Sequence, residues 1–256
     1  MLQPAYDLSH RYTEHGRWHQ CGAQGGLRPG VTTVLGRTMP AGREAFLADW
    51  RERVGHEAAE RIKVRATDQG SWLHRRIECH LLGEHFVAPD GIELDEEQHE
   101  NIEKMWRKML PILGEVEEVY GIELPCFWEG PDPQKHDVSW GYAGSVDCVA
   151  RIHGQLVVID WKTTSSTPKP LHWLLAEGSA YDLQLAAYAN ALAHTYQELP
   201  PIDMAAIVIV AAKGRPQIIE LDREDLLQAE NAFGARLHAF YEQLRQAAEG
   251  DLLALA

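Results

Sequence analysis

The sequence lacks paired cysteines and long apolar runs. Its four cysteines are Cys21, Cys79, Cys126 and Cys148, and no two form a Cys-x-x-Cys pair. Zinc and iron–sulfur sites mostly depend on such spacing, so we expect reduced thiols and no metal–thiolate site. The longest clean apolar run covers residues 205–212, which suits a buried strand and is far too short to cross a bilayer.

We also see no secretory signal. Such a signal begins with a basic segment followed by an apolar one, and Met-Leu-Gln-Pro-Ala-Tyr-Asp does not show this order. We therefore predict a cytoplasmic protein with no membrane partner. Its 256 residues can bury one substantial core, and no segment has the composition of a linker between domains. We expect a single domain over residues 1–256, with an irregular lead-in at 1–30, a helical arch region at 43–120 and a core region at 124–247.

Basic residues are scarce overall but gathered locally. The formal net charge of −14 argues superficially against a polyanionic partner. Residues 61–76 reverse this balance with five bases against Asp68 alone, and residues 161–176 and 204–219 contain two bases each and no acid. Two interpretations stay open: the strips are solvated faces with no partner, or they hold a polyanion in a groove.

Apolar periodicity predicts helices and strands in mixed order. Helical spacing covers residues 43–65, 66–82, 94–119, 181–196 and 223–247. Strand-like segments cover residues 31–35, 124–128, 145–152, 156–163, 205–212 and 217–221. We expect Pro111 to kink or split its helix, a loop at 130–137 and a linker at 167–170. The fold class is a mixed α/β core, a mixed central sheet flanked by helices, with an N-terminal helical insertion.

The stretch 141–164 carries charged residues within two strands that otherwise suit a protein core. Side chains alternate between the two faces of a strand, so Asp160 and Lys162, two residues apart, lie on the same face. If the hairpin between the strands is tight, Asp147 lies beside Asp160. Two carboxylates and an ammonium at a buried sheet end need compensation, which a divalent cation would supply. An ordinary salt bridge at exposed strand ends fits the spacing equally well.

Two predicted helices carry further polar pairs. His74 and Glu78 are four residues apart on one helix, and Gln184 and Tyr188 are four apart on an alanine-rich helix. Residues at this spacing share a helix face. Taken alone, each pair is compatible with ordinary packing or solvent exposure.

Four motifs in this order resemble those of the PD-(D/E)XK nuclease superfamily, in particular its RecB-type branch. They are Gly70-Ser-Trp-Leu-His74, Gly144-Ser-Val-Asp147, Val158-Ile-Asp160-Trp-Lys162-Thr163 and Gln184-x-x-x-Tyr188. The run from Val31-Thr-Thr-Val to His74 is also similar to phage and mitochondrial genome-maintenance exonucleases. The resemblance covers roughly residues 30–240, and it departs from the family pattern where Val146 replaces the proline before Asp147.

The resemblance implies a restriction-endonuclease-like core and metal-assisted hydrolysis of phosphodiester bonds. Mg²⁺ or Mn²⁺ would be held by Asp147, Asp160, the main-chain carbonyl of Trp161 and His74. Lys162 would act electrostatically on the attacking water and on the developing charge, because an ammonium of ordinary pKa is a poor base. Supporting residues would be Gln184, Tyr188 and Glu78, the last of these either beside the ligands or a plain helix carboxylate. The iron–sulfur cluster of some relatives should be absent, because no cysteine follows Cys148.

The partner that the resemblance implies is DNA, and no residue pattern here separates DNA from RNA. Candidate DNA-contacting residues are Arg75, Arg76, Trp72, Thr163, Lys169 and Lys213, with Trp161 and Trp173 as further surfaces on which bases could stack. The expected function is an exonuclease on single-stranded DNA or DNA ends in replication, recombination or repair. A structure-specific endonuclease and a non-catalytic nucleic-acid-binding module are the alternatives.

Overall fold

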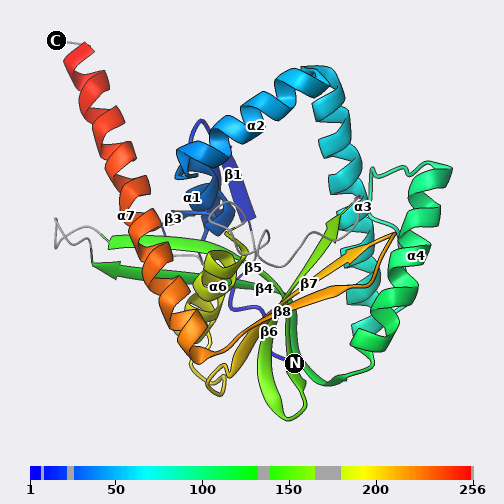
Figure 1. The fold of residues 1–256 in the computed structure, drawn as a ribbon. Helices are drawn as coiled ribbons and strands as arrows, with labels where there is room; N and C mark the ends of the chain where they lie inside the picture. Colours follow the sequence, from blue (N-terminus) through cyan, green and yellow to red (C-terminus); the bar gives the residue numbers. More distant parts are fainter. Residues whose placement is uncertain (7–8, 22–25, 132–138, 165–179, 255–256) are drawn as a thin grey trace.

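A computed structural model describes residues 1–6, 9–21, 26–131, 139–164 and 180–254. Two sheets are present in this part of the chain, a three-stranded sheet of order β1-β2-β3 and a five-stranded sheet of order β4-β5-β6-β7-β8. Figure 1 shows the larger sheet between two groups of helices. This agrees with the predicted mixed α/β core.

The five-stranded sheet is mixed. Its strands are β4 (Val116–Pro131), β5 (Ser139–Ile152), β6 (Gln155–Thr164), β7 (Met204–Ala211) and β8 (Gln217–Leu221). Neighbours are antiparallel except β6 and β7, which are parallel. The predicted hairpin is present, and its turn residues His153 and Gly154 both have positive φ, as a tight type I′ turn requires.

Helices cover both faces of this sheet. Helices α3 (His56–Leu82) and α4 (Glu96–Leu113) pack on one face through Leu73, Ile77 and Met109. Helices α6 (Tyr181–Thr195) and α7 (Arg223–Ala254) pack on the other, together with α1 (Val31–Arg37). Each layer buries one apolar helix stripe, and helix α6 makes the connection that a parallel β6–β7 pair needs.

The ends of helix α4 follow local signals. Asp95 and Gln98 form a reciprocal capping box at its start. Pro111 lies within the last turn, and the helix ends at Leu113. The predicted continuation to residue 119 is wrong, because β4 already begins at Val116.

The N-terminal region is more ordered than expected. Residues 1–30 contain β1 (Ser9–Thr13), β2 (Gly16–Gln20) and β3 (Leu27–Pro29) where we predicted an irregular lead-in. Residues 31–35, predicted as a strand from their β-branched side chains, begin helix α1. The reason is burial at helical spacing: Val31, Val34 and Leu35 are all buried in the core beside α6 and α7.

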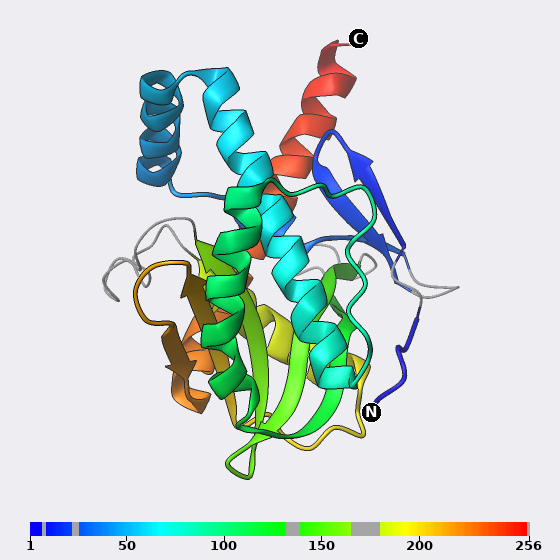
Figure 2. The ribbon, with the colours of Figure 1, turned by 90° about the vertical axis from the view of Figure 1, so that its right-hand side faces the viewer.

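Helix α2 (Ala41–Val54) and the first half of α3 rise away from the sheet as an arch (Figures 1 and 2). No residue of α2 is buried. The helices meet at Gly55, whose φ of 89° and ψ of 139° favour glycine, so the predicted break between residues 65 and 66 is wrong. Among the described residues, no helix combines the length and apolarity needed to span a bilayer.

Candidate active site

Three adjacent strands each carry one carboxylate at the same level. On β4 and β5, the residues flanking Glu123 are paired with those flanking Asp147, so the two acids lie opposite each other. On β6, Asp160 follows Ile159, the partner of Cys148 on β5. Asp147 therefore occupies the middle strand between two other acids.

The sheet twists sharply at these acids. On β4, Ile122 packs into the core beneath α3 and α4, whereas Leu124 packs into the core beside α6 and α7. Residues two apart on a regular strand share one face. The partner strand makes the same switch between Val146 and Cys148. Glu123, at the switch, has a φ of 45°, which is uncommon for a residue with a side chain.

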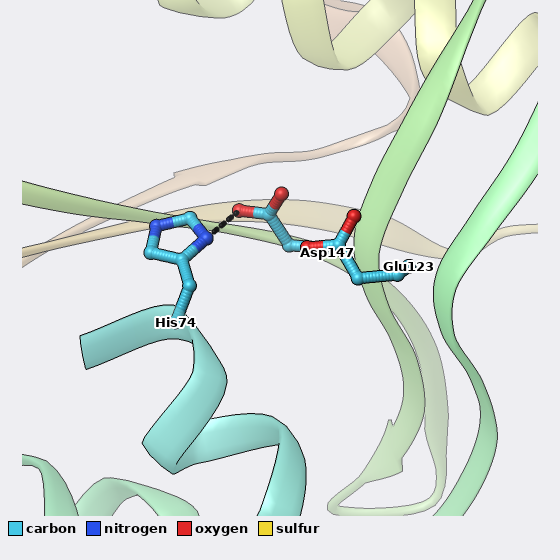
Figure 3. A group of neighbouring side chains, drawn as sticks. All are labelled: His74, Glu123 and Asp147. Carbon is cyan, nitrogen blue, oxygen red and sulfur yellow. Dashed lines mark ion pairs between the residues drawn. The ribbon is translucent and has the colours of Figure 1, made fainter. Parts of the chain in front are cut away.

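Helix α3 brings His74 to the strand end. Gly70, one turn earlier, lies close to β6, since a β-carbon there would be 3.4 Å from Thr163 Oγ1. His74 Nε2 donates to the main-chain carbonyl of Trp161 at 2.7 Å. Its Nδ1 lies 3.7 Å from Asp147 Oδ2 (Figure 3). The structure thus brings together the side chains of the predicted first and second motifs.

Asp160 is buried and held by two polar groups. Lys162 Nζ lies 2.5 Å from Asp160 Oδ2, and Gln184 Nε2 donates to Asp160 Oδ1 at 3.1 Å. Gln184 Nε2 also approaches the hydroxyl of Tyr188 at 3.3 Å. Burial raises the pKa of Asp160, Lys162 opposes the shift and the charge of Asp147 adds to it. The predicted Gln184–Tyr188 pair therefore faces the site.

Lys162 is placed as a permanent cation. Burial alone would lower its pKa, but the carboxylates of Asp160 and Asp147 outweigh this effect and raise the pKa of Lys162 above its usual value. The ring of Tyr181 lies 5.7 Å from Nζ, measured to the ring centroid. In this geometry, Lys162 can stabilise negative charge but has no tendency to accept a proton.

Glu123, which none of the predicted motifs contains, also lies at this site. One ligand atom from each of His74, Glu123 and Asp147 lies within 4.8 Å of the other two, and Figure 3 shows the three side chains converging. Ser145 Oγ donates to Glu123 Oε2 at 3.0 Å. Although the residue as a whole is exposed, desolvation of its carboxyl and the charge of Asp147 raise the pKa of Glu123 to about 7. Its one sequence signal was an acid between two apolar residues, Ile122 and Leu124.

The donor set fits a hard divalent cation. It offers the clustered ligand atoms of His74, Glu123 and Asp147 and the main-chain carbonyl of Trp161 beside His74, ligands that suit Mg²⁺ or Mn²⁺. The two oxygens of Asp160 contact Lys162 and Gln184. Trp161 N–H donates to Asp147 Oδ2 at 2.8 Å and fixes that carboxylate. The ammonium of Lys162 faces the carboxylates of Asp160 and Asp147, and the carboxylate of Glu123 beside Asp147 adds negative charge that a cation would balance.

Two predicted DNA-contacting residues of α3 face helix α4 instead. Trp72 makes ring contacts with Phe86 and His99, and Arg76 is ion-paired with Glu103. Successive residues of an α-helix are about 100° apart, so Trp72 and Arg76 share a face about 200° from His74. These contacts do not support a role for either residue at the site.

The other predicted site residues lie at different distances from the site. Glu78 is ion-paired with Arg75 at 2.7 Å and raises the pKa of Glu123 by its charge, so both lie at the margin of the site. The indole of Trp161 is buried and cannot stack on a base. Lys213 is exposed in the turn that follows β7. Lys169, Trp173 and the linker at 167–170 lie outside the described residues, as does most of the loop at 130–137.

The basic strip at 61–76 is compensated within the protein. All five of its bases lie within ion-pairing distance of an acid; the pairs are Arg61–Glu57, Lys63–Glu60, Arg65–Asp95, Arg75–Glu78 and Arg76–Glu103. Exposed pairs of this kind are weak and exchange with solvent. The pairing favours a solvated face over a dedicated polyanion surface for this strip.

The sequence matches a known family over most of its length. A family model described as the PD-(D/E)XK nuclease superfamily matches residues 45–254. Mitochondrial genome maintenance exonuclease 1 of Mus musculus is 31% identical over 194 residues, which cover 73% of this chain and 51% of that protein. The Homo sapiens protein of the same name is 29% identical over 196 residues, covering 73% of this chain and 50% of its own length.

The chain thus spans about half the length of the curated relatives it matches. Among solved structures, a protein of Eubacterium rectale assigned provisionally as an exonuclease aligns with a TM-score of 0.46 and 15% identity. That alignment covers 69% of this chain and 66% of the other. The predicted cytoplasmic location stays a prediction.

Proposed function

The chain belongs to the PD-(D/E)XK nuclease superfamily, and we propose that it is a divalent-metal-dependent deoxyribonuclease. Its reaction is hydrolysis of phosphodiester bonds, as an exonuclease on single-stranded DNA or DNA ends. The cellular setting we propose is replication, recombination or repair. Relatives named as exonucleases support this proposal, although the chain matches only about half of their length.

One observation carries the proposal: the motif residues converge at one strand end although they come from four separate elements, α3, β5, β6 and α6. His74 on α3 approaches both Asp147 and the carbonyl of Trp161, while Asp160 is bonded to Lys162 and Gln184. Asp160 is buried and Asp147 half-buried, and two neighbouring carboxylates away from water are unfavourable for folding alone. Their position beside an imidazole and a carbonyl supports cation binding.

Each group then has a separate task. Asp147, Asp160, His74 and the Trp161 carbonyl would hold the cation, and Glu123 is positioned to add a ligand. The bound cation would lower the pKa of a water molecule and stabilise charge on the phosphoryl oxygens. Lys162 would place its positive charge beside the scissile phosphate. Gln184 holds one oxygen of Asp160, which leaves the other for Lys162 or the cation.

The arch is the reason for proposing a strand or an end as substrate. Helix α2 contains no buried residue and stands over the strand ends beside α3 (Figure 1). Helix α2 does not pack on the core, which suggests that it contacts a substrate instead. A flexible polynucleotide strand suits a site beneath an arch. If phosphate contacts dominate binding, affinity should fall steeply with salt.

The test is digestion of end-labelled linear DNA and circular single-stranded DNA with Mg²⁺, Mn²⁺ or EDTA, with RNA of the same sequence alongside. We expect release of nucleotides from linear DNA only with a divalent cation, and none from Asp160→Asn. The exposed Asp90→Asn is the matched control and should behave as the parent. Cleavage of the circle would assign an endonuclease, whereas DNA binding without any cleavage would assign a binding module.

A further inference from the structure

The N-terminal hairpin of β1 and β2 lies in a segment whose charge is opposite in sign to the net charge of the chain. Between residues 8 and 43 the sequence has five arginines and a single acid, Glu14, in a protein of net charge −14. The same segment contains three histidines, a tyrosine and a tryptophan. Basic residues interleaved with aromatic ones are typical of surfaces that bind nucleic acid.

The strand register gathers several of these residues on one face. Tyr12 is paired with Arg17, and His10 is paired with His19, across β1 and β2. Cross-strand partners share a face, as do residues two apart on one strand. Tyr12 is 76% exposed, and its ring contacts that of His10 at 5.4 Å between centroids. An exposed aromatic ring beside a guanidinium offers one stacking and one phosphate contact.

The hairpin is fixed to the body of the protein. On its opposite face, Trp18 contacts Phe240 of α7 at 6.2 Å between ring centroids. Thr33 Oγ1 of α1 accepts from Arg17 N–H at 3.1 Å and donates to Arg17 O at 3.0 Å. The guanidinium of Arg37 donates to the main-chain carbonyl of His15. These contacts use the Trp18 ring on the opposite face and backbone atoms of the hairpin, so the side chains of His10, Tyr12 and Arg17 take no part in them.

The arginines of this surface differ from the compensated bases of residues 61–76. Within the described part of the chain, no carboxylate lies within ion-pairing distance of the guanidinium of Arg11 or Arg17. Glu14 lies in the turn, 3.4 Å from the ring of His15. Arg17, which shares the face of Tyr12, therefore carries a positive charge that no carboxylate of the described residues balances, and this charge complements a polyanion.

The hairpin also lies on the side of the sheet from which the arch rises. Figures 1 and 2, at right angles to each other, both place β1 and β2 above the five-stranded sheet, at the level of the arch. The hairpin precedes residue 45, where the match to the superfamily begins. It therefore lies outside the part of the chain that the superfamily model matches.

We propose that this surface, formed by His10, Tyr12 and Arg17, binds the DNA strand outside the bond that is cut. Tyr12 stacks on a base, and Arg17 contacts a phosphate. The inference rests on the proposed function and names a contact for that substrate beyond the catalytic centre. It predicts that affinity depends on strand length.

The test compares two double variants of the full chain. Tyr12→Ser/Arg17→Gln removes a ring and a charge from the hairpin surface. Leu227→Ser/Arg223→Gln removes an exposed apolar side chain and a charge from α7, near its N-terminus, where both residues are exposed. Binding of fluorescent oligodeoxythymidylates is measured by anisotropy in EDTA. Two strand lengths are used, about 6 and about 30 nucleotides, because they span the usual site sizes for single strands.

We expect the hairpin variant to bind the long strand about tenfold more weakly and the short strand as the parent does. For the long strand, the slope of log K against log salt concentration should be reduced in magnitude by about 0.7, because one phosphate contact is lost. The α7 variant should match the parent on both strands. Unchanged affinity for the long strand, or an equal loss on both lengths, would overturn the inference. Cleavage of the short strand with Mn²⁺ tests the proposed function separately, because the hairpin surface plays no part in it.

Discussion

The ring of Tyr188 occupies the space that a side chain on Gly144 would need. A β-carbon at position 144 would lie 2.6 Å from Tyr188 Cε1, well inside contact distance. Both residues are buried, so neither can move into solvent. Only glycine at position 144 leaves room for the ring of Tyr188. Gln184 contacts the hydroxyl of Tyr188 and donates to Asp160, so it links the tyrosine to the site.

Gly144→Ala should lower both stability and turnover. Overpacking of a filled core costs about 1–3 kcal/mol, and displacement of Tyr188 would disturb the hydrogen bond from Gln184 to Asp160. Urea unfolding and single-turnover cleavage measure the two effects. Gly234→Ala is the control, because a β-carbon on that exposed helical glycine would have no other atom within 4 Å and the change should add about 0.5–1 kcal/mol. If Gly144→Ala is equally harmful in a Tyr188→Leu background, the two residues are not coupled.

Glu123→Gln should weaken cation binding. The substitution keeps the size of the side chain and removes the charge that faces His74 and Asp147. Groups that support a metal site change its affinity by about 10–100-fold, so Mn²⁺ titration by calorimetry should show at least a tenfold loss. Glu220→Gln, exposed on β8, is the matched control. An unchanged Mn²⁺ affinity would remove Glu123 from the site.

Cation affinity should also depend on pH near neutrality. The pKa of Glu123 is raised to about 7 and that of Asp160 to about 6, so each binds a proton as the pH falls and that proton must leave before a cation binds. The apparent affinity for Mn²⁺ should be constant above pH 7, then fall by about tenfold per pH unit below it, and more steeply below pH 6. Glu123→Gln should remove the fall in affinity between pH 7 and pH 6. An affinity of the parent that stays constant from pH 7 to below pH 6 would contradict the assignment.

Lys162→Ala should abolish turnover while leaving DNA and Mn²⁺ binding in place. The raised pKa of Lys162 means that its positive charge is present at all pH values used for assays, so its loss removes charge stabilisation rather than a base. Rates under single-turnover conditions and anisotropy with the same oligonucleotide separate chemistry from binding. Near-normal turnover in this variant would refute the role of Lys162.

Local rules predict much of the site. Strand alternation places Asp160 with Lys162, and helical spacing places Gln184 with Tyr188; the structure has both pairs in contact. The turn at His153 and Gly154 follows from the same short-range signals. Such relationships need no knowledge of distant parts of the chain.

Other features depend on contacts that no local pattern encodes. Glu123 lies at the site because β4 pairs with β5 in one register and because its own φ is positive. Burial of Val31 and Leu35 beside α6 and α7 overrides the β-branched propensity of their segment. The position of Arg76 away from the site was predictable, since its angular distance from His74 on the helix follows from the sequence.

His19 makes stability depend on pH. It is 1% exposed, and neither ring nitrogen has a hydrogen-bond partner among the described residues. Burial and the neighbouring charges of Arg17 and His10 lower its pKa from 6.5 to about 4. Between these values the unfolded chain binds a proton that the folded protein does not, so the free energy of unfolding must fall as the pH falls.

The full effect, reached near pH 4, is about 3 kcal/mol at 1.36 kcal/mol per pKa unit. Urea unfolding of the parent and of His19→Gln at pH 7.5 and at pH 5 isolates this contribution, because other groups titrate alike in both proteins. The variant should lose less stability than the parent between the two pH values. His153→Gln, at an exposed turn, should retain the pH dependence of the parent. Equal losses in the parent and in His19→Gln would mean that His19 is protonated in the folded protein, which its burial without a partner argues against.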